Sequence, residues 1–323
     1  MNLLVTGGAG FIGSHFVKHQ LKSKSWNKIY VLDSLTYAGN RSNLADIEFE
    51  EEILFVKSDI NEQEVVEDLT NKVQYVVHFA AESHVDRSIS GPRSFITTNV
   101  LGTQNLLEYS LRNKVRKFIH ISTDEVYGSI EHGSWNEFEP VKPNSPYSAS
   151  KASSDLVAMS YAKTYGLDVC VTRCSNNYGS FQHIEKVIPL FITNLIQDKK
   201  VPLYGNGLNS RDWLHVSDHC NAIELVLQKG RQGEVYNIGG GKELSNLELT
   251  HSILDLMKKD RSFINYVEDR KGHDLRYSVD YSKLHLETGY KPQIDFFEGL
   301  SETISWYEKN EKWWREIILR NEK

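Results

Sequence analysis

The sequence has few cysteines and no long stretch that is strongly basic or continuously apolar. Its three cysteines, an odd number without framework spacing, favour a reducing cytosol. No apolar run approaches the roughly 20 residues of a membrane span, and the N-terminus resembles no signal peptide. The net charge of -6, without a Lys/Arg block, argues against nucleic acid as a partner. We therefore predict a cytoplasmic protein without a metal site, in which Cys170 and Cys174 are buried structural thiols.

The chain has 323 residues, enough for about two domains. Its first half alternates short apolar stretches with amphipathic helical patterns, which predicts a parallel, doubly wound sheet. The expected strands cover residues 2–6, 29–33, 54–56, 75–79, 118–121 and 169–172. We predict an α/β fold with a Rossmann-type NAD-binding domain over residues 1–178, which also carries the catalytic residues. A smaller α/β substrate-binding domain over residues 179–323 would follow, with some segments returning to the sheet.

A glycine-rich turn follows the first expected strand. Gly7, Gly10 and Gly13 suit a tight turn, close approach to a pyrophosphate and close helix–strand packing. The next helix would present free N–H groups and its positive dipole end to the phosphates. Asp33 lies 20 residues after Gly13, the spacing of an acid that binds the adenine ribose. Its charge would repel a 2′-phosphate, which favours NAD over NADP; the alternative is that Asp33 only caps a loop.

A polar cluster follows the expected strand at residues 118–121. Thr123, Asp124 and Glu125 would lie at its carboxyl end, where ligands bind in open α/β sheets. Tyr147 and Lys151 are four residues apart, so a helix would place them on one face. A lysine ammonium beside the phenol would lower its pKa and let it take a proton from an alcohol. Taken alone, Tyr147 and Lys151 would more often be an exposed helix pair, and Thr123, Asp124 and Glu125 a helix cap or a solvated loop.

Together these motifs resemble the extended short-chain dehydrogenase/reductase family. The resemblance rests on Thr6 to Gly13, Asp33, and the Tyr147/Lys151 pair. Further segments resemble the dTDP-glucose 4,6-dehydratase branch of the family and extend over nearly the whole chain. These segments are Leu35 to Asn40, Ala80 to Ser88, Ser122 to Gly128, Ser145 to Ser154, Cys174 to Gly179, Arg211 to Trp213, Tyr236 to Gly240 and Gly272 to Asp274. The adjacent Asp124 and Glu125 discriminate, because epimerases and decarboxylases of the family generally lack this pair.

The resemblance implies a redox-neutral dehydration of dTDP-glucose on a tightly bound, recycled NAD, within deoxysugar biosynthesis such as that of dTDP-rhamnose. Tyr147 would take the C4 hydroxyl proton, with Lys151 holding the phenolate and Thr123 orienting the oxygen. Glu125 would remove the C5 proton, and a protonated Asp124 would protonate the departing C6 hydroxyl. Both acidic residues must then lie on a turn beyond the strand, because neighbours on a strand point to opposite faces.

The resemblance also implies two sets of binding residues, some of which belong to both. The cofactor set is Gly7, Gly10, Phe11, Ile12, Gly13, Asp33, Ser34, Leu35, Thr36, Asp59, Ile60, Phe79, Ala80, Ala81, Ser83, Thr98, Tyr147, Lys151 and Asn177. The substrate set is Ser83, His84, Thr123, Asn176, Glu185, Lys186, Val187, Pro202, Tyr204, Arg211, Asn246, Asp269, Arg270 and His273.

Other interpretations stay open at this point. The chain could be an epimerase or act on another nucleotide sugar, and a non-catalytic NAD sensor would be expected to lose Tyr147, Lys151 or Thr123. The resemblance implies a homodimer through the helices near residues 93–111 and 148–165. The tail around Trp313 and Trp314 could pack on the body, close the substrate domain or contact another subunit.

Overall fold

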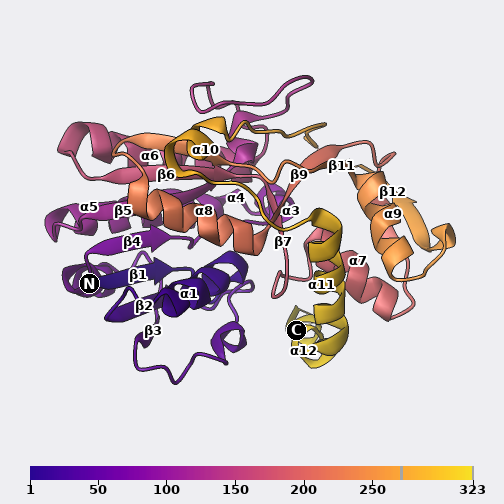
Figure 1. Ribbon diagram of the computed structural model, residues 1–323, viewed down its shortest axis with the longest axis horizontal. Helices are drawn as coiled ribbons and strands as arrows, with labels where there is room; N and C mark the ends of the chain where they lie inside the picture. The colour runs from indigo at the N-terminus through magenta and orange to yellow at the C-terminus, as the bar shows by residue number, and fades with distance from the viewer. Residues whose placement is uncertain (270–271, 322–323) are drawn as a thin grey trace.

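Seven parallel strands form the central sheet of the protein, whose computed structural model describes residues 1–269 and 272–321 (Figure 1). The order across the sheet is β10-β6-β5-β4-β1-β2-β3. The strands are β1 (Asn2–Thr6), β2 (Lys28–Asp33), β3 (Ile53–Lys57), β4 (Tyr75–His78), β5 (Lys117–Thr123), β6 (Val169–Cys174) and β10 (Glu234–Ile238). The predicted doubly wound α/β sheet is confirmed. The strand order reverses between β1 and β4, and in such sheets the crevice at this point binds ligands.

Helices cover both faces of this sheet. They are α1 (Phe11–Ser23), α2 (Gln63–Lys72), α5 (Thr103–Arg112), α6 (Pro146–Tyr165) and α8 (Val216–Lys229). Successive strand residues point to opposite faces, so Leu3 and Val5 of β1 pack with α1 and α8, whereas Leu4 packs with α2, α5 and α6. A sheet that is buried on both sides needs apolar residues at every position, which is why its strands lack polar alternation.

Two smaller sheets lie beside the central one, with orders β11-β9-β7 and β12-β8. Their strands are β7 (Asn176–Tyr178), β8 (Val201–Tyr204), β9 (Ser210–His215), β11 (Glu243–Ser245) and β12 (Ile264–Val267). Helices α7 (Val187–Ile196), α9 (Asn246–Leu256), α11 (Phe296–Lys309) and α12 (Glu311–Asn321) pack around them. Tyr307 and Trp314 are fully buried in this core, so the C-terminal tail packs on the body of the protein.

One expected helix differs from the prediction. Residues 93–111 were expected to form one regular helix, but α4 (Pro92–Phe95) continues through a π-helical segment at Ile96–Gly102 before α5 begins. This segment contains Thr98, which lines a cavity, and Asn99, whose side chain bonds both backbone groups of Glu82. Single π turns frequently occur at functional sites, and this one fixes the segment after β4. The remaining elements are α3 (Val85–Ser90), α10 (Ser282–Thr288), and short 3-10 turns at Arg41–Leu44, Asp124–Tyr127 and Arg261–Phe263.

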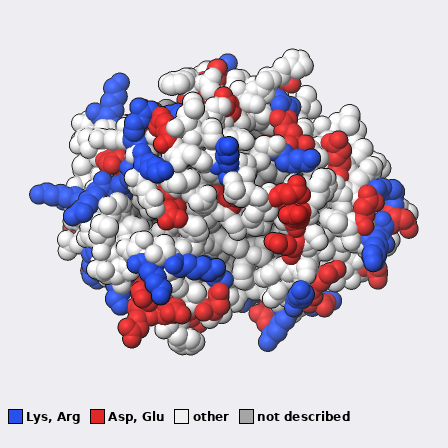
Figure 2. Space-filling model, in the orientation of Figure 1, with Lys and Arg blue, Asp and Glu red and all other residues white. Residues whose placement is uncertain are grey.

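Several expectations from composition can be compared with the structure. All three cysteines are buried free thiols, as predicted for Cys170 and Cys174. Within residues 1–269 and 272–321, no group of three or more His, Cys, Asp or Glu side chains is placed to hold a metal ion. In the same part of the chain, no helix has the length and apolar character needed to cross a membrane. Lys and Arg side chains are interspersed with Asp and Glu over the face drawn in Figure 2.

Candidate active site

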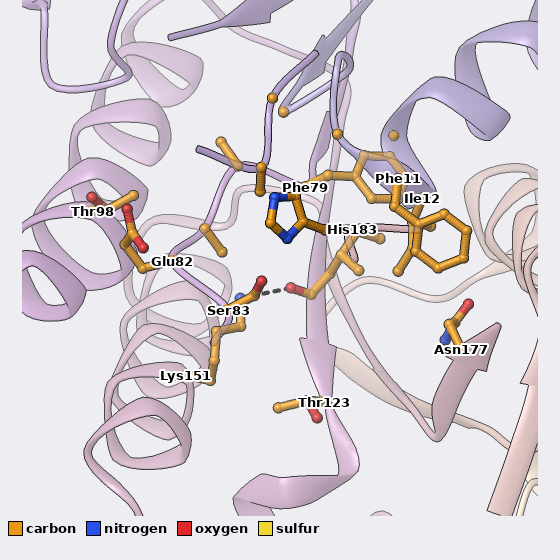
Figure 3. Close-up of a pocket in the computed structure, with 18 of the residues that line it drawn as sticks. Phe11, Ile12, Phe79, Glu82, Ser83, Thr98, Thr123, Lys151, Asn177 and His183 are labelled. Atoms are coloured by element: carbon orange, nitrogen blue, oxygen red, sulfur yellow. Dashed lines mark hydrogen bonds between the residues drawn. The ribbon is translucent and has the colours of Figure 1, made fainter. Parts of the chain in front are cut away.

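A cavity of about 290 Å³ lies at the carboxyl ends of the central strands (Figure 3). Its lining brings together most of the residues predicted from the sequence. These are Gly7, Gly10, Phe11, Ile12, Gly13, Asp33, Ser34, Thr36, Asp59, Ile60, Phe79, Ala80, Ala81, Ser83, Thr98, Thr123, Asp124, Glu125, Tyr147, Lys151, Asn176, Asn177 and Lys186. In Figure 3, Phe11 and Ile12 lie towards the opposite end of the cavity from Thr123 and Lys151. The cavity therefore joins the glycine turn to the predicted catalytic cluster.

The glycine turn leaves no room for side chains at two of its predicted positions. Gly7 has φ +69°, and a Cβ there would lie 2.6 Å from the Ala80 nitrogen. A Cβ on Gly13 would lie 2.2 Å from the Gly7 carbonyl oxygen, so this glycine permits the close packing of α1 on β1. The turn then presents the N-terminus of α1 to the cavity, which suits the pyrophosphate of a dinucleotide such as NAD.

Asp33 links two backbone segments at the end of β2. Its carboxylate accepts hydrogen bonds from the Ala9 N–H (2.9 Å) and the Leu35 N–H (2.8 Å). Burial raises the pKa of Asp33, although both hydrogen bonds act in the opposite direction. Each carboxylate oxygen has a second lone pair, so the group can still accept from two ribose hydroxyls. The residues at this end of the cavity therefore fit the adenosine half of NAD.

The acidic pair lies where the hypothesis requires it. Strand β5 ends at Thr123, whose hydroxyl caps a 3-10 turn that begins at Asp124, so the chain leaves the sheet before the two carboxylates. Asp124 is buried, and one of its oxygens has no hydrogen-bond partner among the described residues. Burial raises the pKa of Asp124 well above its ordinary value, and the charges of Glu125 and Asp212 raise it further. The raised pKa favours the protonated form of Asp124, the form that can act as an acid.

Helix α6 positions Tyr147 and Lys151. It begins with a capping box between Ser145 and Ser148 and a proline at the first turn, which fixes the register of the helix. The Lys151 Nζ donates to the Ile121 carbonyl at 2.7 Å, next to the end of β5. Burial lowers the pKa of Lys151 to about 8, so its ammonium stays charged at neutral pH.

The sequence predicted that Lys151 would lower the pKa of Tyr147. In the structure the pKa of Tyr147 is raised instead, so this prediction is wrong. Burial raises the pKa of Tyr147 well above its ordinary value, and the nearby Glu125 carboxylate raises it further. A hydrogen bond with Thr123 acts in the opposite direction. The sequence showed the Tyr–Lys spacing but not the burial, and the cost of burying a phenolate exceeds the benefit of a nearby cation. Tyr147 therefore rests as a neutral phenol.

Replacing Asp124 by Asn is expected to stabilise the protein, increasingly so as the pH rises. The pKa of Asp124 is raised above 3.8, so the folded state holds a proton that the unfolded chain releases. The stability that this proton contributes is complete below pH ~4 and is lost as the pH rises towards the folded-state pKa. Each unit of pKa difference corresponds to about 1.4 kcal/mol, so we expect a gain of about 1 kcal/mol or more at pH 8.

Denaturant unfolding of the Asp124→Asn variant and the wild type at pH 4, 6 and 8 measures this difference. Asp46→Asn is a matched control, because Asp46 is an exposed carboxylate in an ion pair with Lys18. A stability gain for Asp124→Asn that does not change with pH would contradict the protonated state of Asp124.

Several predicted substrate residues lie beside the cavity without lining it. His84, Glu185 and Val187 belong to this group. The Arg87 guanidinium donates to both oxygens of Glu185 (Nε to Oε2, 3.1 Å) and stacks on the ring of Tyr37 at 4.0 Å. His84 lies 3.7 Å from the same carboxylate. This ion-pair cluster connects the segment after β4 with the segment before α7.

A second group of predicted substrate residues lies farther from the cavity. Its described members are Pro202, Tyr204, Arg211, Asn246, Asp269 and His273, whereas Arg270 lies outside the described residues. The rings of Tyr204 and His273 are in edge contact, and His273 bonds Asp269 at 2.6 Å. Arg211 is buried; it donates to the carbonyl of Asp274 at 2.9 Å and opposes the rise in the pKa of Asp124. Tyr204, Asp269 and His273 therefore form one cluster at the end of β8, whereas Arg211 lies on β9, nearer to Asp124.

The cavity also contains residues that the sequence reasoning missed, and Leu35, predicted for the cofactor, does not line it. The missed residues are Leu32, Ala38, Gly39, Ser58, Glu82, Ile121, Ser122, Cys174, Ser175, Gln182 and His183. Five of the eleven are direct neighbours of predicted residues, so their position was an available signal; these are Leu32, Ser58, Glu82, Ser122 and Ser175. Gln182 and His183 come from a loop whose local sequence gives no such signal. Leu35 has φ +54°, donates its N–H to Asp33 and lines a neighbouring cavity of about 550 Å³ instead.

Comparison with known proteins identifies the family. A model of the GDP-mannose 4,6 dehydratase family matches residues 4–303. The dTDP-glucose 4,6-dehydratase of Streptomyces antibioticus is 56% identical over 325 residues, which cover 99% of this chain and 96% of the relative. The chain belongs to the dTDP-glucose 4,6-dehydratase family. The resemblance inferred from the sequence motifs is thereby confirmed.

Solved structures of dTDP-glucose 4,6-dehydratases share the same fold. DesIV from Streptomyces venezuelae, crystallised with NAD and dTDP, has a TM-score of 0.97 and 55% identity; the match covers 98% of this chain and 100% of DesIV. The Bacillus anthracis enzyme, in complex with NAD, has a TM-score of 0.92 and 51% identity, over 98% and 99% of the two chains. The likeness extends over both the glycine turn and the catalytic cluster, because nearly the whole chain is covered.

Proposed function

We propose that the protein dehydrates dTDP-glucose to dTDP-4-keto-6-deoxyglucose, with NAD bound tightly and recycled. One observation carries the proposal: a buried Asp124, whose pKa burial raises, adjoins Glu125, Tyr147 and Lys151 in a cavity that also contains the glycine turn. An elimination needs both an acid and a base, and two carboxylates with different environments provide them. The sequences of relatives named dTDP-glucose 4,6-dehydratase, identical at half or more of their positions, support the substrate.

The first step is oxidation of the sugar at C4. When bound at the glycine turn and Asp33, NAD would supply the hydride acceptor, and its positive ring would favour deprotonation of a nearby hydroxyl. Tyr147 first loses its own proton to solvent, which the positive charge of the bound cofactor, the Lys151 cation and the hydrogen bond with Thr123 favour; the phenolate then takes the C4 hydroxyl proton. Lys151 stays cationic below a pKa of about 8 and stabilises the negative charge that develops on the Tyr147 oxygen.

The second step is loss of water between C5 and C6. The new C4 ketone acidifies the C5 proton, which Glu125 removes. Asp124 gives its proton to the departing C6 hydroxyl, and its unpartnered buried oxygen is available for that hydrogen bond. Hydride then returns to C6 and a proton to C5, so the cofactor leaves the cycle unchanged. The two carboxylates have separate roles because burial raises the pKa of Asp124 and so favours its protonated, acidic form.

Two regions support the assignment of the nucleotide and sugar contacts. Asn176 lines the cavity with a buried side-chain oxygen that has no partner among the described residues, which suits a sugar hydroxyl donor. The cluster of Tyr204, Asp269 and His273 offers rings and polar groups for a thymine base. The proposed domain division agrees with this assignment, since the cluster lies after residue 178 and the glycine turn before it.

Mass spectrometry of dTDP-glucose after incubation with the purified protein and no added NADH tests the function. The proposal expects loss of one water and no accumulation of NADH. An unchanged mass with conversion to the galactose isomer would mean an epimerase instead. If dTDP-glucose and UDP-glucose were both unchanged despite bound NAD, the sensor interpretation would gain support. A faster reaction with UDP-glucose than with dTDP-glucose would contradict the proposed base.

We also infer that the protein is a cytoplasmic homodimer serving deoxysugar biosynthesis, such as the dTDP-rhamnose pathway. The exposed apolar residues Leu101 (54% exposed) and Leu156 (63% exposed) support the dimer, because they lie on the π-helical segment and α6, which pack together. Exposed apolar groups of this kind mark protein interfaces. Light scattering on the eluting protein measures its mass; a monomeric wild type would contradict the dimer, and Leu156→Glu is expected to produce monomers.

A further inference from the structure

Asn43 connects two distant parts of the chain next to the cofactor end of the cavity. Its side chain is 1% exposed and uses both polar atoms. The Nδ2 donates to the Ala9 carbonyl in the glycine turn at 2.9 Å, and the Oδ1 accepts from the indole N–H of Trp313 at 2.9 Å. Trp313 follows Asn43 by 270 residues and lies on α12. A single buried amide therefore joins the C-terminal helix to the glycine turn.

Helix α12 is a firm support for this contact. Trp314, the next residue, is fully buried and donates its indole N–H to the Tyr307 carbonyl at 2.9 Å. The ring of Trp313 packs edge-on against Trp306 and Phe181, with centroids at 5.1 and 5.8 Å. These contacts fix the orientation of the indole, whose N–H is directed at Asn43.

Asn43 bonds the backbone of Ala9, which belongs to the glycine turn at the cofactor end of the cavity. Ala9 lies between Gly7 and Gly10; its N–H donates to Asp33, and its carbonyl also accepts from the Asn40 N–H at 3.0 Å. Hydrogen bonds to Ala9 therefore hold residues 34–43 against the glycine turn. Thr36, Ala38 and Gly39 of this loop line the cavity, so the position of the loop determines how closely that end is covered.

The outer side of the same loop is not tightly packed. A second cavity of about 550 Å³ separates it from α12, with Tyr37, Arg41, Trp313 and Ile317 in its lining. Packed protein interiors resist movement because they have few voids, and this space removes that resistance on the outer side. The bond between Trp313 and Asn43 therefore lies beside a space that the loop could otherwise enter.

We propose that Asn43 and Trp313 form a latch through which α12 holds residues 34–43 against the glycine turn and slows the release of NAD. Both are positioning residues that act through the loop, and neither is assigned to the chemical steps. The inference rests on the proposed function for the identity of the cofactor. A slow release suits a reaction in which the same cofactor gives back the hydride that it accepted.

The test compares the rate at which NADH leaves the wild type and its variants. Each protein is loaded with NADH, an excess of NAD is added, and the decay of nicotinamide fluorescence gives the release rate. Trp313→Phe keeps an aromatic ring but removes the N–H, and we expect release to be roughly fivefold faster, as for loss of one hydrogen bond. Trp314→Phe is a matched control, because it removes a buried indole N–H from the same helix away from the loop.

The outcomes separate the latch from general destabilisation and from the choice of cofactor. Melting temperatures of both variants show whether either is unfolded. Equal release rates for Trp313→Phe and Trp314→Phe would overturn the latch. The double variant Asn43→Ala/Trp313→Phe should release NADH no faster than Asn43→Ala alone, and fully additive effects would also overturn it. A wild type that binds no NADH would contradict the proposed function itself.

Discussion

Replacing Glu125 by Gln is expected to stop the reaction after the first hydride transfer. Glutamine has the shape of the acid but takes up no proton, so the C5 proton stays in place once C4 is oxidised. Removal of a positioned general base costs about 10² to 10⁴ in rate, and we expect dehydration to fall by roughly 10³. Tyr147, Lys151 and Thr123 are unchanged, so dTDP-glucose should still produce enzyme-bound NADH. A rise in absorbance at 340 nm without loss of water from the sugar is the expected result.

Deuterium exchange distinguishes the base from its neighbour. In deuterated water, the wild type and Asp124→Asn should exchange the C5 proton of the oxidised sugar, because both keep Glu125. Glu125→Gln should show no exchange, whereas Asp124→Asn should fail only at the departure of the C6 hydroxyl. If Glu125→Gln dehydrates at the wild-type rate or exchanges C5 normally, Glu125 is not the base.

The parts of the site that the sequence predicted best are those fixed by local backbone geometry. The spacing of Gly7, Gly10 and Gly13 has a direct steric meaning, since a Cβ at Gly13 would lie 2.2 Å from the Gly7 oxygen. The role predicted for Asp33 follows from its place at the end of β2. The turn at Asp124 was a requirement of the chemistry, and the 3-10 turn satisfies it. The ends of strands can be predicted from the sequence because apolar runs stop there and polar residues begin.

Properties that depend on tertiary packing could not be read from the sequence. The raised pKa of Tyr147 results from its burial, which the Tyr–Lys spacing does not reveal. Gln182 and His183 enter the cavity from a loop without regular pattern. The contact between Trp313 and Asn43 joins residues 270 positions apart, and a tail rich in tryptophan is compatible with several packing arrangements. Local patterns indicate which residues form an element, whereas the fold decides which elements meet.

Replacing Tyr147 by Phe is expected to block the reaction one step earlier than Glu125→Gln. The C4 hydroxyl then has no acceptor for its proton, and a hydride cannot leave a carbon whose oxygen stays protonated without forming a high-energy cation. We expect both NADH formation and dehydration to fall by about 10³ or more. Phenylalanine fills the same buried space beside Phe95, so the fold and the affinity for NADH should change little.

Tyr161→Phe is a matched control for Tyr147→Phe. Tyr161 lies on the same helix, but its hydroxyl donates to Glu108 at 3.0 Å on the side away from the cavity. Its loss should leave turnover near the wild-type value. The comparison with Glu125→Gln then orders the steps, because one variant accumulates NADH from substrate and the other does not. Rapid NADH formation by Tyr147→Phe would show that another group takes the C4 proton, and Thr123, which shares its hydrogen bond, would be the next residue to replace.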